Sequence, residues 1–293
     1  MGRLRATLIL AAFLALTIPL MPVQALFARV RPSAARRFPY WYHRQVCRLL
    51  GIRLHVEGAI TSGKPVLLVS NHTSWLDIPV LSAVAPVSFV AKREVGSWPF
   101  VSSLARLQRT VFVDRDRKSA AGQSANEIAE RLGQGDTVVL FAEGTSSDGN
   151  RVLPFLTSLF GAAKPSAGSS VQPPLDAVVQ TLSVVYTKLH GVPLGIADRP
   201  HVGWYGDMEM KAHAWALLQA GPLDVAICIG PPIPLADFAD RKALARHCET
   251  EVRRNVVRML RSAAPGEDIA VTVPLDTAVG RRLPAAATSS NWR

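Results

Sequence analysis

The first apolar stretch of the chain covers residues 6–27, which include no charged side chain. About 20 apolar residues are enough for a helix to cross a bilayer. Pro19 and Pro22 weaken the segment as a straight span, because proline removes a helical hydrogen bond, so a kinked or shallow position in one leaflet is the alternative. A cleaved signal peptide is a second alternative. Arginines follow the stretch at once and resist export, which favours a retained membrane segment.

Residues 36–50, RRFPYWYHRQVCRLL, mix aromatic side chains with arginines. This composition is typical of a helix that lies at the level of the lipid headgroups, where both kinds of side chain find partners. An ordinary amphipathic helix packed on the folded domain is the alternative.

From residue 51 onward, short apolar runs alternate with more polar stretches. We expect strands at residues 52–57, 65–70, 87–91, 110–114, 137–142, 176–186 and 223–229. We expect helices at residues 75–83, between the strands at 87–91 and 110–114, at about 119–132 and at 241–261. The alternation predicts an α/β fold with a mixed sheet covered by helices, preceded by an N-terminal membrane-associated helical segment.

The same pattern divides the chain into three parts. Residues 1–50 form the membrane anchor and interfacial helix, and residues 51–263 form the folded domain. Residues 264–293 are rich in alanine, proline and serine, which predicts a poorly ordered tail.

The net charge of +11 indicates an anionic partner. No zinc-finger, RNA-recognition or basic-zipper pattern accompanies the arginines, so a membrane surface is favoured over nucleic acid, and we expect no nucleic-acid partner. Cys47, Cys228 and Cys248 lack any CxxC spacing. They predict neither disulfides nor a metal site, but small buried side chains in a protein of a reducing compartment.

The most specific local pattern is NHTSWLD at residues 71–77, directly after the apolar strand that ends at Ser70. Histidine can take a proton from a hydroxyl near neutral pH, and a carboxylate on its other ring nitrogen fixes its tautomer. Residues five apart on a helix point about 140° from each other, so His72 and Asp77 meet only if His72 precedes the helix. The alternative is that Asn71 or Thr73 caps the helix and His72 is merely exposed.

Two further patterns lie at strand ends. FAEGTSS at residues 141–147 follows an apolar strand, and its glycine turn can direct backbone N–H groups at an oxyanion or a phosphate. VFVDR at residues 111–115 is a strand that ends in an arginine, whose planar fork suits a phosphate or carboxylate.

Taken together, the three patterns resemble the glycerolipid acyltransferase family typified by 1-acylglycerol-3-phosphate acyltransferases. Its NHxxxxD motif is met by Asn71, His72 and Asp77, and its strand ending in arginine by residues 112–115. Its FPEGT motif is met by Phe141, Glu143, Gly144 and Thr145. Residues 178–186 loosely match its fourth motif, an apolar strand, and the resemblance covers about residues 35–230 in order and spacing.

The resemblance implies a direct reaction without an acyl-enzyme intermediate. His72, oriented by Asp77, would deprotonate the hydroxyl of a lysolipid, which attacks an acyl thioester of acyl carrier protein or coenzyme A. Arg115, Glu143, Gly144 and Thr145 would hold the polar head of the acceptor. Lys92 would add charge there, or would be a solvated surface amine. No cofactor or metal is implied.

The chain departs from the family pattern at residues that bear on the acceptor. Ser146 stands where an arginine is common, Ala142 where proline is usual, and Leu156 where a lysine is common. Arg151 is a candidate replacement for the missing cations. We expect 1-acyl-sn-glycerol-3-phosphate as acceptor, which would give phosphatidic acid, with a zwitterionic lyso-ornithine lipid as the alternative.

Three other interpretations compete with this one. A non-catalytic membrane lipid-binding protein would keep the fold without needing His72, whereas a serine hydrolase lacks its GxSxG turn. Asp207 and His213, in a tryptophan-rich stretch, form a conceivable second acid–base pair, although aromatic packing against membrane or acyl chain is favoured. We expect the enzyme at the inner cell membrane with its catalytic domain on the cytoplasmic side.

Overall fold

The computed structural model describes residues 1–113, 121–163, 174 and 176–262. Two long helices come first, α1 (Gly2–Val30) and α2 (Pro32–Leu50). Gly51 ends α2 with a φ of 75°, a left-handed conformation that glycine adopts without steric cost. The chain then enters the sheet.

The sheet is mixed and runs in the order β1-β8-β6-β2-β5-β3-β4, with two short strands, β7 and β9, paired to β6. β6 and β8 pair antiparallel, and the other neighbours in this order pair parallel. The strands are β1 (Ile52–Glu57), β2 (Val66–Ser70), β3 (Ser88–Lys92), β4 (Val111–Val113), β5 (Thr137–Phe141), β6 (Val178–Leu189), β7 (Val192–Pro193), β8 (Leu223–Ile229) and β9 (Ile233–Pro234). The expected α/β fold with a mixed sheet is confirmed.

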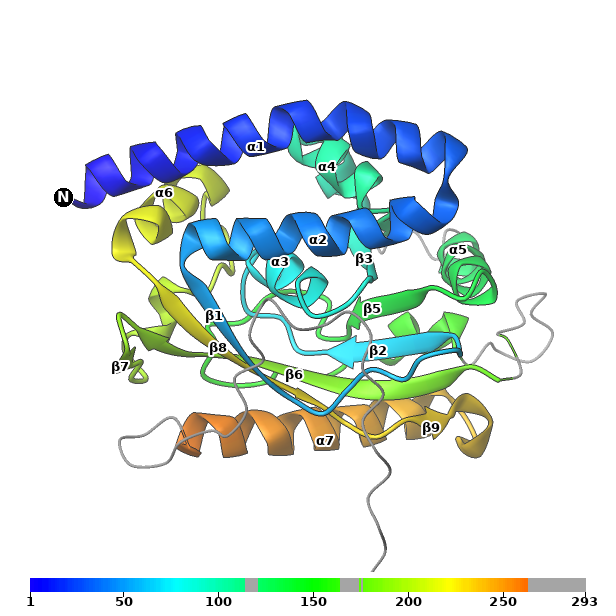
Figure 1. Cartoon of the computed structure of the whole chain (residues 1–293). Helices are drawn as coiled ribbons and strands as arrows, with labels where there is room; N and C mark the ends of the chain where they lie inside the picture. The colour runs from blue at the N-terminus through cyan, green and yellow to red at the C-terminus, as the bar shows by residue number, and fades with distance from the viewer. Residues whose placement is uncertain (114–120, 164–173, 175, 263–293) are drawn as a thin grey trace, which may run out of the picture.

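Helices cover both faces of this sheet (Figure 1). On one face lie α2, α3 (Asp77–Ser82) and α6 (Met210–Ala220), and α7 (Arg241–Ser262) lies on the other. The remaining helices are α4 (Val101–Leu107), α5 (Ala121–Gly133) and the 3-10 turns η1 (Arg93–Ser97), η3 (Thr157–Ala162), η4 (Arg199–His201) and η5 (Leu235–Asp237). Two buried apolar clusters result, one on each face of the sheet.

The central strand β2 is a continuous apolar run because both of its faces are covered. Val66 and Leu68 belong to the cluster under α2 and α3, while Leu67 and Val69 belong to the cluster under α7. A strand covered on both faces has no solvent side and needs no polar alternation. Its carboxyl end, after Ser70, is where the candidate catalytic residues follow.

Helix α1 continues through Pro19 and Pro22 without ending, and it lies beside α2, α4 and α6 (Figure 1). Among the described residues it is the helix long and apolar enough to cross a membrane. Two of its polar side chains are buried against the protein: Thr17 Oγ1 lies 2.7 Å from the Tyr42 hydroxyl, and Gln24 Nε2 donates to the carbonyls of Ala35 and Leu107. Besides Arg3, Thr7 and Arg29 toward its ends, the helix exposes a row of large apolar side chains: Leu4, Leu8, Leu10, Leu14, Ile18, Val23, Leu26 and Val30.

Helix α2 combines features of both interpretations of its sequence. Ala35, Val46 and Cys47 are buried against the domain, whereas Trp41 is exposed. The carboxylate of Asp136, after α5, pairs with Arg36 of α2 across 3.1 Å. The helix is therefore packed on the domain and still presents an aromatic, basic face outward.

Cys47, Cys228 and Cys248 are free, and they are buried as expected. Burial raises the pKa of Cys47 and of Cys248 to about 12, so both thiols stay protonated near neutral pH. The tail expected at residues 264–293 lies outside the described residues.

Candidate active site

His72 and Asp77 lie on the connection from β2 to α3. Asp77 is the first residue of α3, and its Oδ2 is 2.7 Å from Nδ1 of His72. The expected geometry is therefore present, with the histidine before the helix and the carboxylate in its first turn. The Asp77 side chain is 0% exposed and the His72 side chain 18% exposed. The carboxylate fixes the proton on Nδ1, which leaves the lone pair of Nε2 as the basic site.

The loop between the two residues is shaped by the same carboxylate. The backbone N–H groups of Thr73 and Ser74 donate to Oδ2 of Asp77 across 2.7 and 3.1 Å. An aspartate in this position satisfies N–H groups that the chain would otherwise leave unpaired before the helix. Asp77 therefore both shapes the loop and orients the imidazole.

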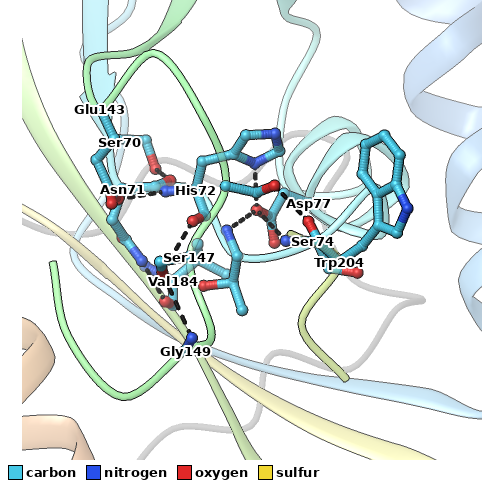
Figure 2. A network of polar contacts seen from close by, with 12 residues as sticks. Ser70, Asn71, His72, Ser74, Asp77, Glu143, Ser147, Gly149, Val184 and Trp204 are labelled. Carbon is cyan, nitrogen blue, oxygen red and sulfur yellow. Dashed lines mark hydrogen bonds and ion pairs between the residues drawn. The ribbon is translucent and has the colours of Figure 1, made fainter. Parts of the chain in front are cut away.

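The backbone of His72 is held by the 141–147 turn, which follows β5 (Figure 2). Its N–H donates to Oε1 of Glu143 across 2.8 Å, and its carbonyl accepts from the N–H of Ser147 across 2.9 Å. The imidazole stacks on the ring of Phe141, with 4.1 Å between centroids. The segments at residues 71–77 and 141–147 thus form one unit, because the strands before them, β2 and β5, are parallel neighbours.

A residue that holds the polar head of the acceptor is expected to face the solvent, but Glu143 is buried. It is 3% exposed, and its second oxygen, Oε2, accepts from the N–H of Leu153 across 2.8 Å. Burial raises its pKa to about 7, against the lowering effect of the N–H groups of His72 and Leu153. This geometry suits a residue that positions His72, and contact with an acceptor stays a prediction.

The other predicted site residues are spread around this unit. Gly144 turns the chain with a φ of 73°, and Thr145 after it is exposed. Lys92 ends β3, is half-exposed, and pairs with Glu94 across 3.5 Å. Arg115 lies outside the described residues. The substrate-binding roles of these four residues stay predictions.

Comparison with known proteins decides the family. A family model described as Acyltransferase matches residues 51–184. A lyso-ornithine lipid O-acyltransferase of Brucella abortus is 47% identical over 92% of this chain and 98% of its own length. Another, of Rhizobium meliloti, is 42% identical over 92% and 94%. The chain belongs to the glycerolipid acyltransferase family.

More distant relatives agree with this acyltransferase assignment. A 1-acyl-sn-glycerol-3-phosphate acyltransferase of Neisseria meningitidis serogroup B is 31% identical over 76% of this chain and 82% of that protein. The crystal structure of the 1-acyl-sn-glycerophosphate acyltransferase of Thermotoga maritima shares the fold, with a TM-score of 0.62. Its sequence is 24% identical, and the match covers 88% of this chain and 98% of that one.

Two contacts of the acyltransferase site were not predicted from its sequence. The side chain of Asn71 forms a reciprocal pair with the backbone of Val184 on β6, both hydrogen bonds measuring 2.9 Å. The hydroxyl of Tyr186, two residues further along β6, donates to Oδ1 of Asp77. Residues 178–186 carried a family resemblance, but no signal in the sequence indicated which side chains of this strand reach the first motif.

The conceivable acid–base pair of Asp207 and His213 has a different arrangement. Asp207 is exposed, whereas His213 is buried and its Nδ1 accepts from Nε1 of Trp75 across 3.1 Å. Burial lowers the pKa of His213, which favours the neutral ring that such a bond requires. His213 therefore supports the indole of Trp75 inside the loop that carries His72.

Ser146, which stands where the family commonly has an arginine after its FPEGT motif, has a structural role in this acyltransferase. Ser146 donates its hydroxyl to the carbonyl of Trp204, and the N–H of Trp204 donates to the carbonyl of Thr73 across 2.9 Å. Trp204 in turn packs edge-on against Trp98, with 6.1 Å between ring centroids. Within the described residues, no group of three or more His, Cys, Asp and Glu side chains is placed to hold a metal ion.

Proposed function

We propose that this acyltransferase moves a fatty acyl group from a thioester to the hydroxyl of a lyso-ornithine lipid, with His72 as the base. The observation that carries the chemistry is the 2.7 Å contact between Nδ1 of His72 and the fully buried carboxylate of Asp77. This contact leaves Nε2 of the partly exposed ring to accept a proton.

The reaction follows from that arrangement. Nε2 of His72 takes the proton of the acceptor hydroxyl while the hydroxyl oxygen bonds to the thioester carbon. The imidazolium is stabilised by Asp77 until the tetrahedral intermediate collapses, the carbon–sulfur bond breaks, and the proton passes to the departing thiolate. The backbone N–H of Thr145, in the turn after Gly144, is the candidate donor to the oxyanion, and a well-placed donor of this kind is worth about 10²–10³ in rate.

The choice of acceptor rests on two observations. The relatives at 47% and 42% identity carry the name of lyso-ornithine lipid O-acyltransferases, while the relative named for 1-acyl-sn-glycerol-3-phosphate is 31% identical. Ser146 and Leu156 also remove two cations with which the family would meet a phosphate. A zwitterionic amino-acid headgroup needs less positive charge, and 1-acyl-sn-glycerol-3-phosphate is the second candidate.

The acyl donor is a thioester of acyl carrier protein or of coenzyme A. Both are anionic, and the net charge of +11 would attract either. The arginines of α2 would also attract anionic lipids, so the charge does not choose between the donors.

We place the enzyme at the inner cell membrane, with its catalytic domain on the cytoplasmic side. Helix α1 lies along α2, α4 and α6; the buried Thr17 and Gln24 bond to neighbouring helices, while a row of large apolar side chains faces outward. A helix packed in this way buries its outer side in one leaflet beside the domain. Arg29, Arg31, Arg36 and Arg37 favour the cytoplasmic side.

The test is product identification with the full chain reconstituted in phospholipid vesicles. Labelled acyl thioesters of acyl carrier protein and of coenzyme A are offered with lyso-ornithine lipid, with 1-acyl-sn-glycerol-3-phosphate, or with no acceptor. We expect labelled ornithine lipid as the main product. Preferential formation of phosphatidic acid would favour the second acceptor, and no product from either acceptor would favour a non-catalytic lipid-binding protein.

A further inference from the structure

A buried tyrosine on β6 ends at the candidate catalytic carboxylate. Tyr186 is 3% exposed, and its hydroxyl donates to Oδ1 of Asp77 across 2.7 Å. Its ring belongs to the apolar cluster beneath α2 and α3, where a phenylalanine ring would fill the same space. The hydroxyl is the part of this side chain that packing alone does not require.

The two oxygens of Asp77 have separate partners. Oδ2 accepts from Nδ1 of His72 and from the backbone N–H groups of Thr73 and Ser74, while Oδ1 accepts from Tyr186. Both oxygens are buried, so a missing donor on Oδ1 could not be replaced by bulk water. With donors on both sides, the plane of the carboxylate is fixed with Oδ2 toward the imidazole.

β6 also holds the start of the same loop. Val184, on the same face as Tyr186, forms the reciprocal pair with Asn71. One strand therefore secures the residue before His72 and the carboxylate that orients it.

We propose that Tyr186 is a positioning residue for acyl transfer: its hydroxyl holds the Asp77 carboxylate in register with His72 and moderates the pull of that carboxylate on the imidazolium. The proposal rests on the proposed role of His72 as base. A hydrogen bond from a neutral hydroxyl disperses the charge of a carboxylate, so a carboxylate with that bond attracts a neighbouring cation less strongly.

The surroundings of Tyr186 keep its hydroxyl protonated, so that it remains a hydrogen-bond donor to Asp77. Burial, with the nearby charge of Asp77, raises the pKa of Tyr186 well above its ordinary value. The other titratable groups that face this pair are His72, Glu143 of the third motif and Cys47 of α2, whose thiol is kept neutral by burial. The phenol thus stays protonated at and above neutral pH.

The test compares pH profiles of acyl transfer for the wild type and Tyr186→Phe in the reconstituted full chain. We expect kcat to fall about 10- to 100-fold, as for a lost hydrogen bond to a charged group, with KM for the lysolipid within about twofold. We also expect the acid-side midpoint of kcat to move to higher pH, because an Asp77 without this donor holds the imidazolium more strongly. A 2,3-difluorotyrosine at position 186, a stronger donor, should move that midpoint to lower pH.

The matched control is Tyr42→Phe, which removes a tyrosine hydrogen bond of the same length, 2.7 Å, from the half-buried Tyr42 of α2 to Thr17 of α1. It should leave the midpoint unchanged. In an Asp77→Asn background, Tyr186→Phe should cost little further activity, because two residues acting through one contact are not additive. The proposal would be overturned if the losses of kcat from Asp77→Asn and Tyr186→Phe multiplied in the double variant, or if the midpoint of the pH profile did not move in Tyr186→Phe. A wild type that is inactive on every lysolipid would contradict the proposed function instead.

Discussion

The backbone N–H of His72 donates to Oε1 of Glu143 across 2.8 Å, although 71 positions separate the two residues in the chain. The contact exists because β2 and β5 are parallel neighbours, so the segments that follow them leave the sheet side by side. The glutamate of the third motif therefore helps to position the histidine of the first motif by holding its backbone.

Glu143 gives a prediction for the pH dependence of stability. Its pKa is raised from 4.5 to about 7, chiefly by burial. A carboxyl group with a higher pKa in the folded protein contributes stability that is complete below pH 4.5 and is lost as the pH rises through about 7. The shift corresponds to about 3 kcal/mol.

The measurement is the free energy of unfolding in detergent, for the wild type and Glu143→Gln, between pH 4.5 and about 7. The wild type should lose stability relative to the variant by up to about 3 kcal/mol across this range. Other titrating groups are common to both proteins and cancel in the difference. A difference that stays constant with pH would contradict the raised pKa.

Asn71 gives a second prediction, because both of its amide atoms replace backbone partners for Val184. Asn71→Ala leaves a buried N–H and a buried carbonyl of β6 unsatisfied, and each such group costs about 1–3 kcal/mol. Chemical unfolding should therefore show a loss of about 2–6 kcal/mol, with reduced acyl transfer. Asn126→Ala, at an exposed position of α5, is the control and should unfold like the wild type.

Much of the fold follows from the apolar pattern alone. β1, β8 and α7 have almost the expected bounds, because the edge strand β1 alternates apolar and polar residues, β8 is buried throughout, and α7 is a long charged helix. α6 was not expected. The aromatic and apolar residues of its region, such as Met208 and Trp215, favoured a contact with membrane or acyl chain, whereas the region forms a helix that covers the sheet. The sequence also did not predict that α1 continues through its two prolines, because the helices it packs against, α2, α4 and α6, include segments distant in sequence.

The site was predictable where its chemistry is local. His72 and Asp77 are five residues apart, and a strand followed by a helix is enough to bring them together. The contacts of Glu143, Asn71 and Tyr186 depend on which strands are neighbours, and the order β6-β2-β5 is a property of the folded sheet. The sequence therefore predicted the reacting pair and named Asn71 and Glu143 without their contacts, and it did not single out Tyr186.

The exposed face of α1 gives a third prediction. Ile18 is 56% exposed on this helix, and we expect it to enter the lipid. A charge at this position must stay solvated, so Ile18→Glu should lower the partition of the protein into anionic phospholipid vesicles about tenfold, or about 1.4 kcal/mol. Flotation with vesicles measures this.

Val257→Glu is the matched control, because Val257 is 41% exposed on α7, which covers the opposite face of the sheet (Figure 1). Its partition should stay within about twofold of the wild type, since that face meets no lipid. Equal losses for both variants would contradict the proposed membrane face.

The most direct test of the central claim is the single-turnover rate of acyl transfer from thioester to lysolipid in His72→Ala and His55→Ala. His55 is the matched control: its Nε2 also meets an aspartate, Asp224, across 3.1 Å, but on the edge strand β1. The account predicts a loss of about 10²–10⁴-fold in His72→Ala, the usual contribution of a general base, and a wild-type rate in His55→Ala. A His72→Ala enzyme that transfers acyl groups at the wild-type rate would contradict it.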